Sequence, residues 1–316
     1  MEFFRNSLTR IVPGIASILL ASATIAPTFA ESNGSGLPPV TKTSYRLPQE
    51  IEAESGYVFG AKTGHGSTRS NGNVTEINSH VKYVVTPVVN QNLDLRLGVN
   101  WDRFSFGTSK MTPNPGVPDT LQSDEFILGA DYKLNDKWLL RLEAAPGLIG
   151  TLDSITFDDV NMPVTLGASY IVNADLQWVF GIIADPRGEY PILPGVGVRW
   201  KFADRWTLNA IPPKPRIEYE LTDAVTLFAG GSIYTGTYRT ARNQGTEVGR
   251  SSLNNALVNY TEGRIGAGAS WKILPNLTLD GEAGEMVYRD FHYYRAKADF
   301  KSSPAPYINI GVTGHF

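Results

Sequence analysis

Apolar and polar residues alternate with a period of two through most of this chain after residue 51, and this pattern limits the possible folds more than any other feature. It is clear at 93–102, 126–134, 195–202 and 264–273. In the first of these, Leu93, Leu95, Leu97, Val99 and Trp101 alternate with Asp94, Arg96, Gly98, Asn100 and Asp102. A period of two is that of a β-strand with one apolar face. Because no stretch after residue 51 has a convincing helical period, we expect an all-β protein.

The links between these segments are alternately short and long. The short links are compact and rich in Asn, Asp or Pro, at 90–92, 135–136, 173–175, 203–204, 222–223 and 275–276. The long links are irregular, at about 63–73, 107–120, 149–162, 186–191, 240–254 and 290–304. A soluble β-sandwich also alternates along its strands, but short turns at one end and long loops at the other are typical of an outer-membrane barrel.

These links divide the chain into about 14 strands, an even number, which places both chain ends on the periplasmic side. The predicted fold is therefore an antiparallel up-and-down transmembrane β-barrel. The segments at 205–211 and 216–221 are shorter than a spanning strand and are joined by Pro212-Pro213-Lys214-Pro215. If they do not span, the count falls to 12. The apolar stretch 163–184 is interpreted as two strands, since a turn at 173–175 interrupts it.

The N-terminal residues have the composition of an export signal. Arg5 and Arg10 precede an apolar stretch from Ile11 to Ile25, and Thr28-Phe29-Ala30 forms a cleavage-type ending. We interpret residues 1–30 as a cleaved signal peptide and residues 31–50, rich in Ser, Gly, Pro and Thr, as a flexible periplasmic leader. The barrel is predicted to cover residues 51–316.

Composition excludes several kinds of chemistry. The chain has no cysteine, so disulfides, thiolate metal sites and thiol catalysis are excluded. It carries 28 Lys and Arg against 31 Asp and Glu, with no basic stripe, so nucleic acid is not an expected partner. The four histidines are far apart in sequence, and we expect no metal and no cofactor.

The chain ends inside a segment that alternates, with apolar residues at Ile308, Ile310, Val312 and Phe316. A terminal strand that closes on an aromatic residue resembles the C-terminal insertion signal of bacterial outer-membrane β-barrel proteins. The resemblance implies that the outer-membrane assembly machinery and outer-membrane lipid are partners, and that the protein resides in the bacterial outer membrane. We expect this strand to close the barrel against the one near 52–62.

Aromatic residues recur close to the short turns. We predict that they form the interfacial girdle of the barrel: Trp101, Tyr132, Trp138, Trp178, Trp200, Trp206 and Trp271. A weak internal repeat relates residues 195–208 to 266–279. These hairpins, with Pro215-Arg216-Ile217-Glu218-Tyr219-Glu220 between them, resemble a family of uncharacterised outer-membrane barrel proteins known as a domain of unknown function. That resemblance implies a barrel and no established activity.

Many charged residues fall on the face opposite the apolar one. Arg or Lys on the lipid face would cost about 2–4 kcal/mol near mid-membrane, so these charges are predicted to line the interior. The candidates for the lumen or a constriction are Arg96, Arg141, Glu143, Arg199, Arg216, Glu218, Glu220, Arg264 and Glu282. Within this set, Glu218 and Glu220 beside Arg199 and Arg216 are the first candidate for the constriction.

Three functions are compatible with this pattern. The first is a passive or weakly selective channel for small solutes. The second is a structural or surface-interaction barrel with a filled lumen, whose outer loops bind a partner. A membrane-embedded lipid hydrolase ranks third, because the nearest combination of catalytic types, Asp290 and His292 with Ser302 and Ser303, lies in a predicted loop. We expect no enzymatic activity.

Overall fold

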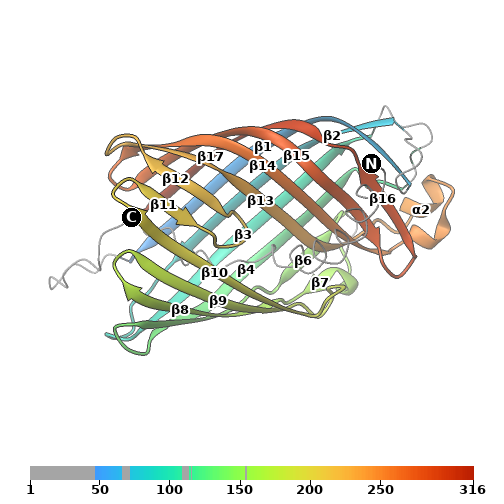
Figure 1. Cartoon of the computed structure of the whole chain (residues 1–316). Coiled ribbons are helices and arrows are strands. Elements are labelled where there is room, and N and C mark those ends of the chain that lie inside the picture. Colours follow the sequence, from blue (N-terminus) through green and yellow to red (C-terminus); the bar gives the residue numbers. More distant parts are fainter. Residues whose placement is uncertain (1–46, 66–71, 109–113, 115, 154) are drawn as a thin grey trace, which may run out of the picture.

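The chain forms a closed antiparallel β-barrel of 14 wall strands (Figure 1). The computed structural model describes residues 47–65, 72–108, 114, 116–153 and 155–316. The predicted signal peptide and most of the predicted leader lie outside these residues. Three of the wall strands are each interrupted once, so the wall is assigned as 17 segments. The predicted count of 14 is confirmed.

Segments that share one wall strand are β5 with β6, β7 with β8, and β16 with β17. The segments up to the middle of the chain are β1 (Gln49–His65), β2 (Gly72–Val85), β3 (Leu93–Gly107), β4 (Thr120–Lys133), β5 (Trp138–Ala144), β6 (Gly147–Gly150), β7 (Val160–Asn161), β8 (Val164–Asn173) and β9 (Leu176–Ala184). The others are β10 (Ile192–Ala203), β11 (Trp206–Asn209), β12 (Arg216–Glu220), β13 (Val225–Arg239), β14 (Leu257–Leu274), β15 (Leu277–Tyr293), β16 (Ala298–Ser302) and β17 (Ala305–His315). The hairpin β8–β9 confirms the interpretation of residues 163–184 as two strands.

The last strand closes the barrel against the first, as predicted. β17 pairs with β1 from Glu50↔His315 to Val58↔Tyr307. Beyond these pairs, the amides of Gln49 and Phe316 each donate to the other residue's carbonyl oxygen at 2.9 Å. β1 therefore begins at Gln49, two residues before the predicted start of the barrel.

Short turns gather at the end of the barrel that holds Gln49 and Phe316, which we call the terminal end. Asparagine side chains stabilise several of them by accepting backbone hydrogen bonds. Asn135 Oδ1 accepts from the amides of Lys137 and Trp138, and Asn173 Oδ1 accepts from the amide of Asp175. Because this turn chemistry is local, it was visible in the sequence.

The opposite end, the loop end, carries the longer links and the short helices η1 (Phe157–Asp159), α2 (Gln244–Glu247) and η2 (Ser251–Leu253). The predicted long link at 290–304 is wrong. β15 continues to Tyr293 and β16 begins at Ala298. Phe291, Tyr293 and Phe300 pack inside the barrel and extend both strands beyond their predicted ends.

A cluster of buried apolar residues fills the interior at the loop end, and we call it the aromatic cluster. Its members are Val74, Phe104, Phe106, Val117, Leu121, Tyr238, Leu253, Val258, Tyr260, Phe291, Tyr293, Ala298 and Phe300. Ring centroids lie 4.9 Å apart for Phe106 and Phe291 and 4.9 Å apart for Phe104 and Tyr260. Val117 and Leu253 come from the links, so two loops contribute directly to this packing.

The outward face is apolar. Exposed aliphatic and aromatic side chains alternate with the inward ones along the wall, and examples are Val99, Phe126, Leu128, Ile182, Val196 and Ile265. Among the described residues, no helix is long and apolar enough to cross a membrane.

The hairpin β11–β12 is much shorter than its neighbours, which run for 12 and 15 residues. β11 pairs with β10 only at the terminal end, from Ala203 to Arg199, and β12 pairs with β13 only up to Gly230. The wall is therefore closed strand to strand at the terminal end. Toward the loop end, β10 and β13 continue beyond the tips of β11 and β12 with no assigned strand between them (Figure 1). We call this part of the wall the β10–β13 gap.

At this gap β13 passes behind the tip of the β9–β10 hairpin. Leu227, Thr235 and Thr237 share one face of β13 because the register along this strand has no shift. Leu227 is exposed on that face, whereas Thr235 and Thr237 are buried on it. The amide of Thr151, just after β6, donates to Arg239 O at 2.9 Å. The sheet therefore overlaps itself at the loop end.

Candidate functional site

Charges of both signs pair with one another inside the half of the barrel next to the terminal end. Arg96 Nε lies 3.2 Å from Glu143 Oε2, and Arg96 Nη2 lies 3.4 Å from Glu50 Oε2. Lys82 Nζ lies 2.9 Å from Glu50 Oε1 and 3.2 Å from Glu52 Oε1. This terminal network connects β1, β2, β3 and β5 across the interior, and Arg96 and Glu143 are buried in it.

The candidate constriction on β12 has different partners from those expected. Glu218 Oε1 accepts a hydrogen bond from Arg216 Nε at 2.7 Å, on its own strand. Lys201 Nζ lies 3.6 Å from Glu220 Oε2, and these two side chains are 35% and 50% exposed. Arg216 is thus beside the acids, and the basic partner of Glu220 is Lys201 instead of the expected Arg199. The constriction itself stays a prediction.

A second network is fully buried toward the middle of the barrel. We call the four charged residues Glu76, Glu262, Arg264 and Arg289 the buried network. Arg264 Nη2 lies 2.9 Å from Glu76 Oε1, and Arg289 Nε lies 2.8 Å from Glu262 Oε2. Tyr260 donates its hydroxyl to Glu76 Oε2 at 2.7 Å. Two carboxylates and two guanidinium groups balance, which is how buried charges are tolerated.

The link between β11 and β12 reaches across the interior. Lys214, in this link, forms an ion pair with Glu54 on β1. Tyr234 on β13 donates to the same carboxylate at 2.8 Å. Because β1 and the link are separated along the wall by β12 to β17, this contact crosses the lumen instead of following the wall.

Three further lumen candidates, Arg141, Glu282 and Arg264, also have partners. Arg141 forms a bidentate pair with Asp131, with N···O distances of 2.6 and 2.7 Å. Glu282 accepts a hydrogen bond from the hydroxyl of Tyr307. Arg264 lies over the rings of Tyr234 and Tyr307, 5.0 Å from each centroid.

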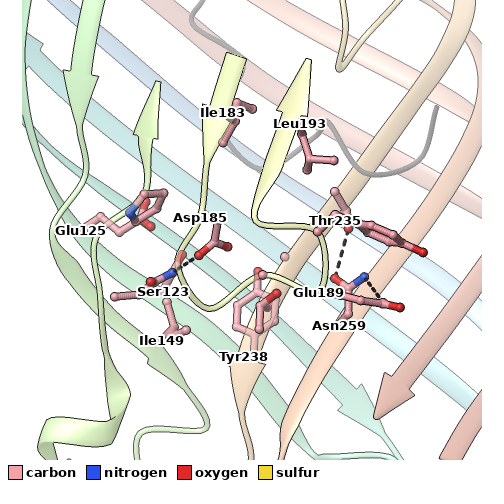
Figure 2. Close-up of a pocket in the computed structure, with 16 residues that line it drawn as sticks. Ser123, Glu125, Ile149, Ile183, Asp185, Glu189, Leu193, Thr235, Tyr238 and Asn259 are labelled. Carbon is pink, nitrogen blue, oxygen red and sulfur yellow. Dashed lines mark hydrogen bonds between the residues drawn. The ribbon is translucent and has the colours of Figure 1, made fainter. Parts of the chain in front are cut away.

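A pocket lies where β13 passes behind the β9–β10 hairpin, and we call it the side pocket (Figure 2). Figure 2 shows Asp185 and Glu189 from the link between β9 and β10, with Tyr238 and Asn259 from β13 and β14 beside them. The full lining is Ser123, Glu125, Ile149, Asn161, Pro163, Ile183, Asp185, Gly188, Glu189, Tyr190, Leu193, Thr235, Gly236, Thr237, Tyr238 and Asn259.

Contacts at the loop end hold the tip of this hairpin in place. Arg187 Nε donates to Val160 O at 2.6 Å, and Tyr294 donates its hydroxyl to Arg187 O at 2.8 Å. Burial raises the pKa of Tyr294 above its ordinary value, so this phenol remains a donor at neutral pH. Glu189 Oε2 lies 3.0 Å from His292 Nδ1. The tip is therefore tied to β7 and β15 on both sides of the pocket.

The residues considered for hydrolysis are not assembled into a catalytic group. His292 contacts Glu189, and Ser302 Oγ lies 2.7 Å from Thr63 Oγ1. Ser303 Oγ accepts from the amide of Lys62 at 3.1 Å. Across the described residues, no three His, Asp or Glu side chains are grouped closely enough to hold a metal ion.

Most of the predicted girdle lies near the terminal end. Rings contact along the outer face there, with centroids 4.8 Å apart for Trp138 and Tyr170 and 4.8 Å apart for Trp206 and Tyr219. Trp101 is different, since it pairs in register with Val81 and Asp124 midway along β3. The interfacial role of these residues stays a prediction.

Several interior residues were missed by sequence reasoning. Glu50, Glu52 and Glu54 share one face of β1, but the strand was taken to start after Glu50. Their every-second-residue spacing was a usable signal. No pattern in the sequence predicts the side pocket, because the pocket depends on the overlap of β13 with a hairpin about fifty residues away in the sequence.

Comparisons with known proteins give similarity to barrel structures. The chain is similar to a Pseudomonas aeruginosa FadL homologue, with 11% identity, 85% of this chain and 90% of that chain covered, and a TM-score of 0.46. It is also similar to the COG4313 outer membrane channel of Pseudomonas putida F1, with 12% identity, 89% of this chain and 100% of that chain covered, and a TM-score of 0.43. The third similar structure is the P. putida toluene transporter TodX, with 8% identity, 86% of this chain and 90% of that chain covered, and a TM-score of 0.42.

A search among curated proteins found no match. A family model does match, over residues 89–314, which include both members of the internal repeat and extend well before them. The match covers more than half of the chain. The chain therefore belongs to the family described as Domain of unknown function (DUF6268).

Proposed function

We propose that this protein is an outer-membrane channel for small solutes, closed at its loop end in the structure described above. The observation that supports this most is the exposure of Lys201 and Glu220 inside the terminal half, since charged side chains remain exposed only where water reaches them. A barrel that serves only as a structural body has no need of a wet, charged interior. Charges of both signs would make such a channel weakly selective.

The outward face supports a place in the membrane. Ile308 and Ile310 on β17 are each more than half exposed, as are Phe126 and Val196 on other strands. An exposed apolar belt of this extent marks contact with lipid. Outer-membrane lipid is thus one proposed partner. Export through a cleaved signal peptide at residues 1–30 belongs to the same proposal.

The loop end would have to rearrange for a solute to pass. Leu253 in η2 and Val117 are buried in the aromatic cluster, and both belong to links instead of wall strands. Tyr293 donates its hydroxyl to Gly116 O at 2.6 Å, which ties one of these links to β15. Movement of these two links would expose the cluster while the wall strands stay paired.

Recordings in a planar lipid bilayer test the channel. We expect the refolded full chain to give small conductance steps, and a variant with a short Gly-Ser link in place of residues 243–253 to give larger ones. Boiled protein is the negative control. Silent membranes with both folded proteins would contradict the proposal.

The second candidate is a barrel with a filled lumen that acts as a structural or surface-interaction protein. The buried network and the aromatic cluster favour it, because together they occupy the interior from mid-barrel to the loop end. The same recordings separate the two. A filled structural barrel should stay silent even with the shortened link.

Assembly has a separate test at the C-terminus. Deletion of Phe316 removes the residue whose backbone closes the barrel with Gln49, and with it the proposed recognition residue of the assembly machinery. We expect lower levels of the truncated protein in the outer membrane, measured by immunoblot of membrane fractions. Phe316→Tyr, which keeps the terminal ring, should assemble normally. Equal levels of the truncated and full-length proteins would rule out this role.

A further inference from the structure

One part of the side-pocket lining is acidic and another part is apolar. Glu125, Asp185 and Glu189 contribute carboxyl groups, and among the sixteen lining residues of the described chain none is Lys or Arg. Ile149, Ile183 and Leu193 contribute aliphatic surface. A ligand that fits both parts has a positive charge at one end and an apolar body.

The two carboxylates at the hairpin tip each have an oxygen available. Asp185 accepts hydrogen bonds from Asn161 Nδ2 at 2.9 Å and from the amide of Arg187 at 3.0 Å, and both bonds end on Oδ1. The contacts of Glu189 with His292 and Asn259 both end on Oε2. Within the described chain, Asp185 Oδ2 and Glu189 Oε1 are therefore the oxygens left to accept from a ligand.

The local basic groups are directed elsewhere. Arg187 lies between the two acids in sequence, but its Nε donates to Val160 O at 2.6 Å. His292 contacts Glu189 at Oε2, with its Nδ1 3.0 Å away, and leaves Glu189 Oε1 as an acceptor. Neither residue lines the pocket.

A buried acceptor in the lining gives independent support for a ligand. Asn161 is only 6% exposed, and its Nδ2 donates to Asp185. Its Oδ1 is buried without a hydrogen-bond partner among the described residues. A buried amide oxygen without a hydrogen-bond partner is unfavourable, so a ligand that supplies a donor there is favoured.

We propose that the side pocket binds a small amphipathic amine. The ammonium group donates to Asp185 Oδ2, Glu189 Oε1 and Asn161 Oδ1, and the apolar body lies against Ile149, Ile183 and Leu193. An ammonium group has three donors, which matches these three acceptors. Binding here does not require the barrel to conduct, so the amine site is tested independently of the proposed channel.

Titration calorimetry on the refolded full chain in detergent tests the site with three probes of one shape. We expect propylammonium to bind, while uncharged 1-propanol and anionic propionate bind at least about tenfold more weakly, since a charge-assisted hydrogen bond contributes about one factor of ten or more. Asp185→Asn and Glu189→Gln should each weaken binding of the amine about tenfold.

Glu220→Gln is the matched control, because it makes the same change in the terminal half, away from the pocket. It should leave amine binding unchanged, and heat-modifiable migration in gels should confirm that all variants fold. Equal affinities for the amine and the alcohol would overturn the proposal. So would amine binding that Glu220→Gln weakens as much as Glu189→Gln does, or no binding of the amine to the folded wild type.

Discussion

The two halves of the barrel interior use the same alternation of residues for different purposes. Near the terminal end, inward positions carry ion pairs, some of them buried, as Arg96 and Glu143 are, and others partly exposed, as Lys201 and Glu220 are. Toward the loop end, inward positions carry Phe106, Phe291 and a set of fully buried charges. Strand periodicity decides which face is inside, but only the residue types decide whether that inside is wet or packed.

This difference also affects stability. A partly exposed ion pair contributes about 0–1 kcal/mol, whereas breaking a buried pair by removing one partner costs about 3–5 kcal/mol. The buried network and the aromatic cluster should therefore hold the barrel together, and the terminal half should tolerate changes that alter only its selectivity. Three substitutions sharpen or break this comparison.

The largest effect is expected for Arg289→Met. Arg289 is fully buried and contacts both Glu76 and Glu262, so its loss leaves two buried carboxylates sharing the guanidinium of Arg264. The free energy of unfolding should fall by about 3–5 kcal/mol in urea titrations of the refolded protein. Arg216→Met, in the terminal half, is the matched control with an expected loss of about 1 kcal/mol or less. Equal losses would mean that the two halves do not differ.

Leu253→Ala comes next. Leu253 is a buried member of the aromatic cluster contributed by a link, and truncating a buried leucine costs about 2–5 kcal/mol. Because the truncation also weakens the packing of this link against the aromatic cluster, conductance in bilayers should rise. Leu274→Ala, which removes an exposed leucine beside the last terminal turn, should change neither quantity. A more stable or less conductive Leu253→Ala protein would argue against a seal at this position.

The smallest effect on stability is expected for Lys201→Met. The pair with Glu220 is half-exposed and 3.6 Å long, so the loss should be about 0–1 kcal/mol. Removing a positive charge from a wet interior should instead increase the preference for cations, measured as a shift of reversal potential in a salt gradient. An unchanged reversal potential together with a large loss of stability would reverse the roles assigned to the two halves.

Much of the wall could be predicted from the sequence, because its determinants are local. The alternation around Leu95 and Leu97 gave the strands, and asparagines such as Asn135 and Asn173 gave the turns. With an even number of strands, closure of β17 on β1 followed. The error at 290–304 arose because Phe291 and Phe300, which pack in the aromatic cluster, were assigned to an irregular link.

The interior could be predicted only as far as which residues point inward. The alternation assigns Arg96 and Glu143 to the interior as lumen candidates, a role that stays a prediction, but partners such as Lys214 and Glu54 depend on how the β11–β12 link folds across the lumen. The side pocket depends on β13 passing behind a hairpin at Asp185. The spacing of residues in the sequence predicts neither arrangement, because both are set by the curvature of the whole sheet.

The contrast between the two halves can be measured directly, because the natural chain has no cysteine. Thr278→Cys places a single thiol inside the terminal half, and Ser232→Cys places one inside the loop half, where Ser232 is buried. Labelling rates with a small charged thiol reagent on the folded protein should be much faster at position 278 than at position 232, with Ile310→Cys as the lipid-facing control. Comparable rates at 278 and 232 would contradict a wet terminal half and a sealed loop half.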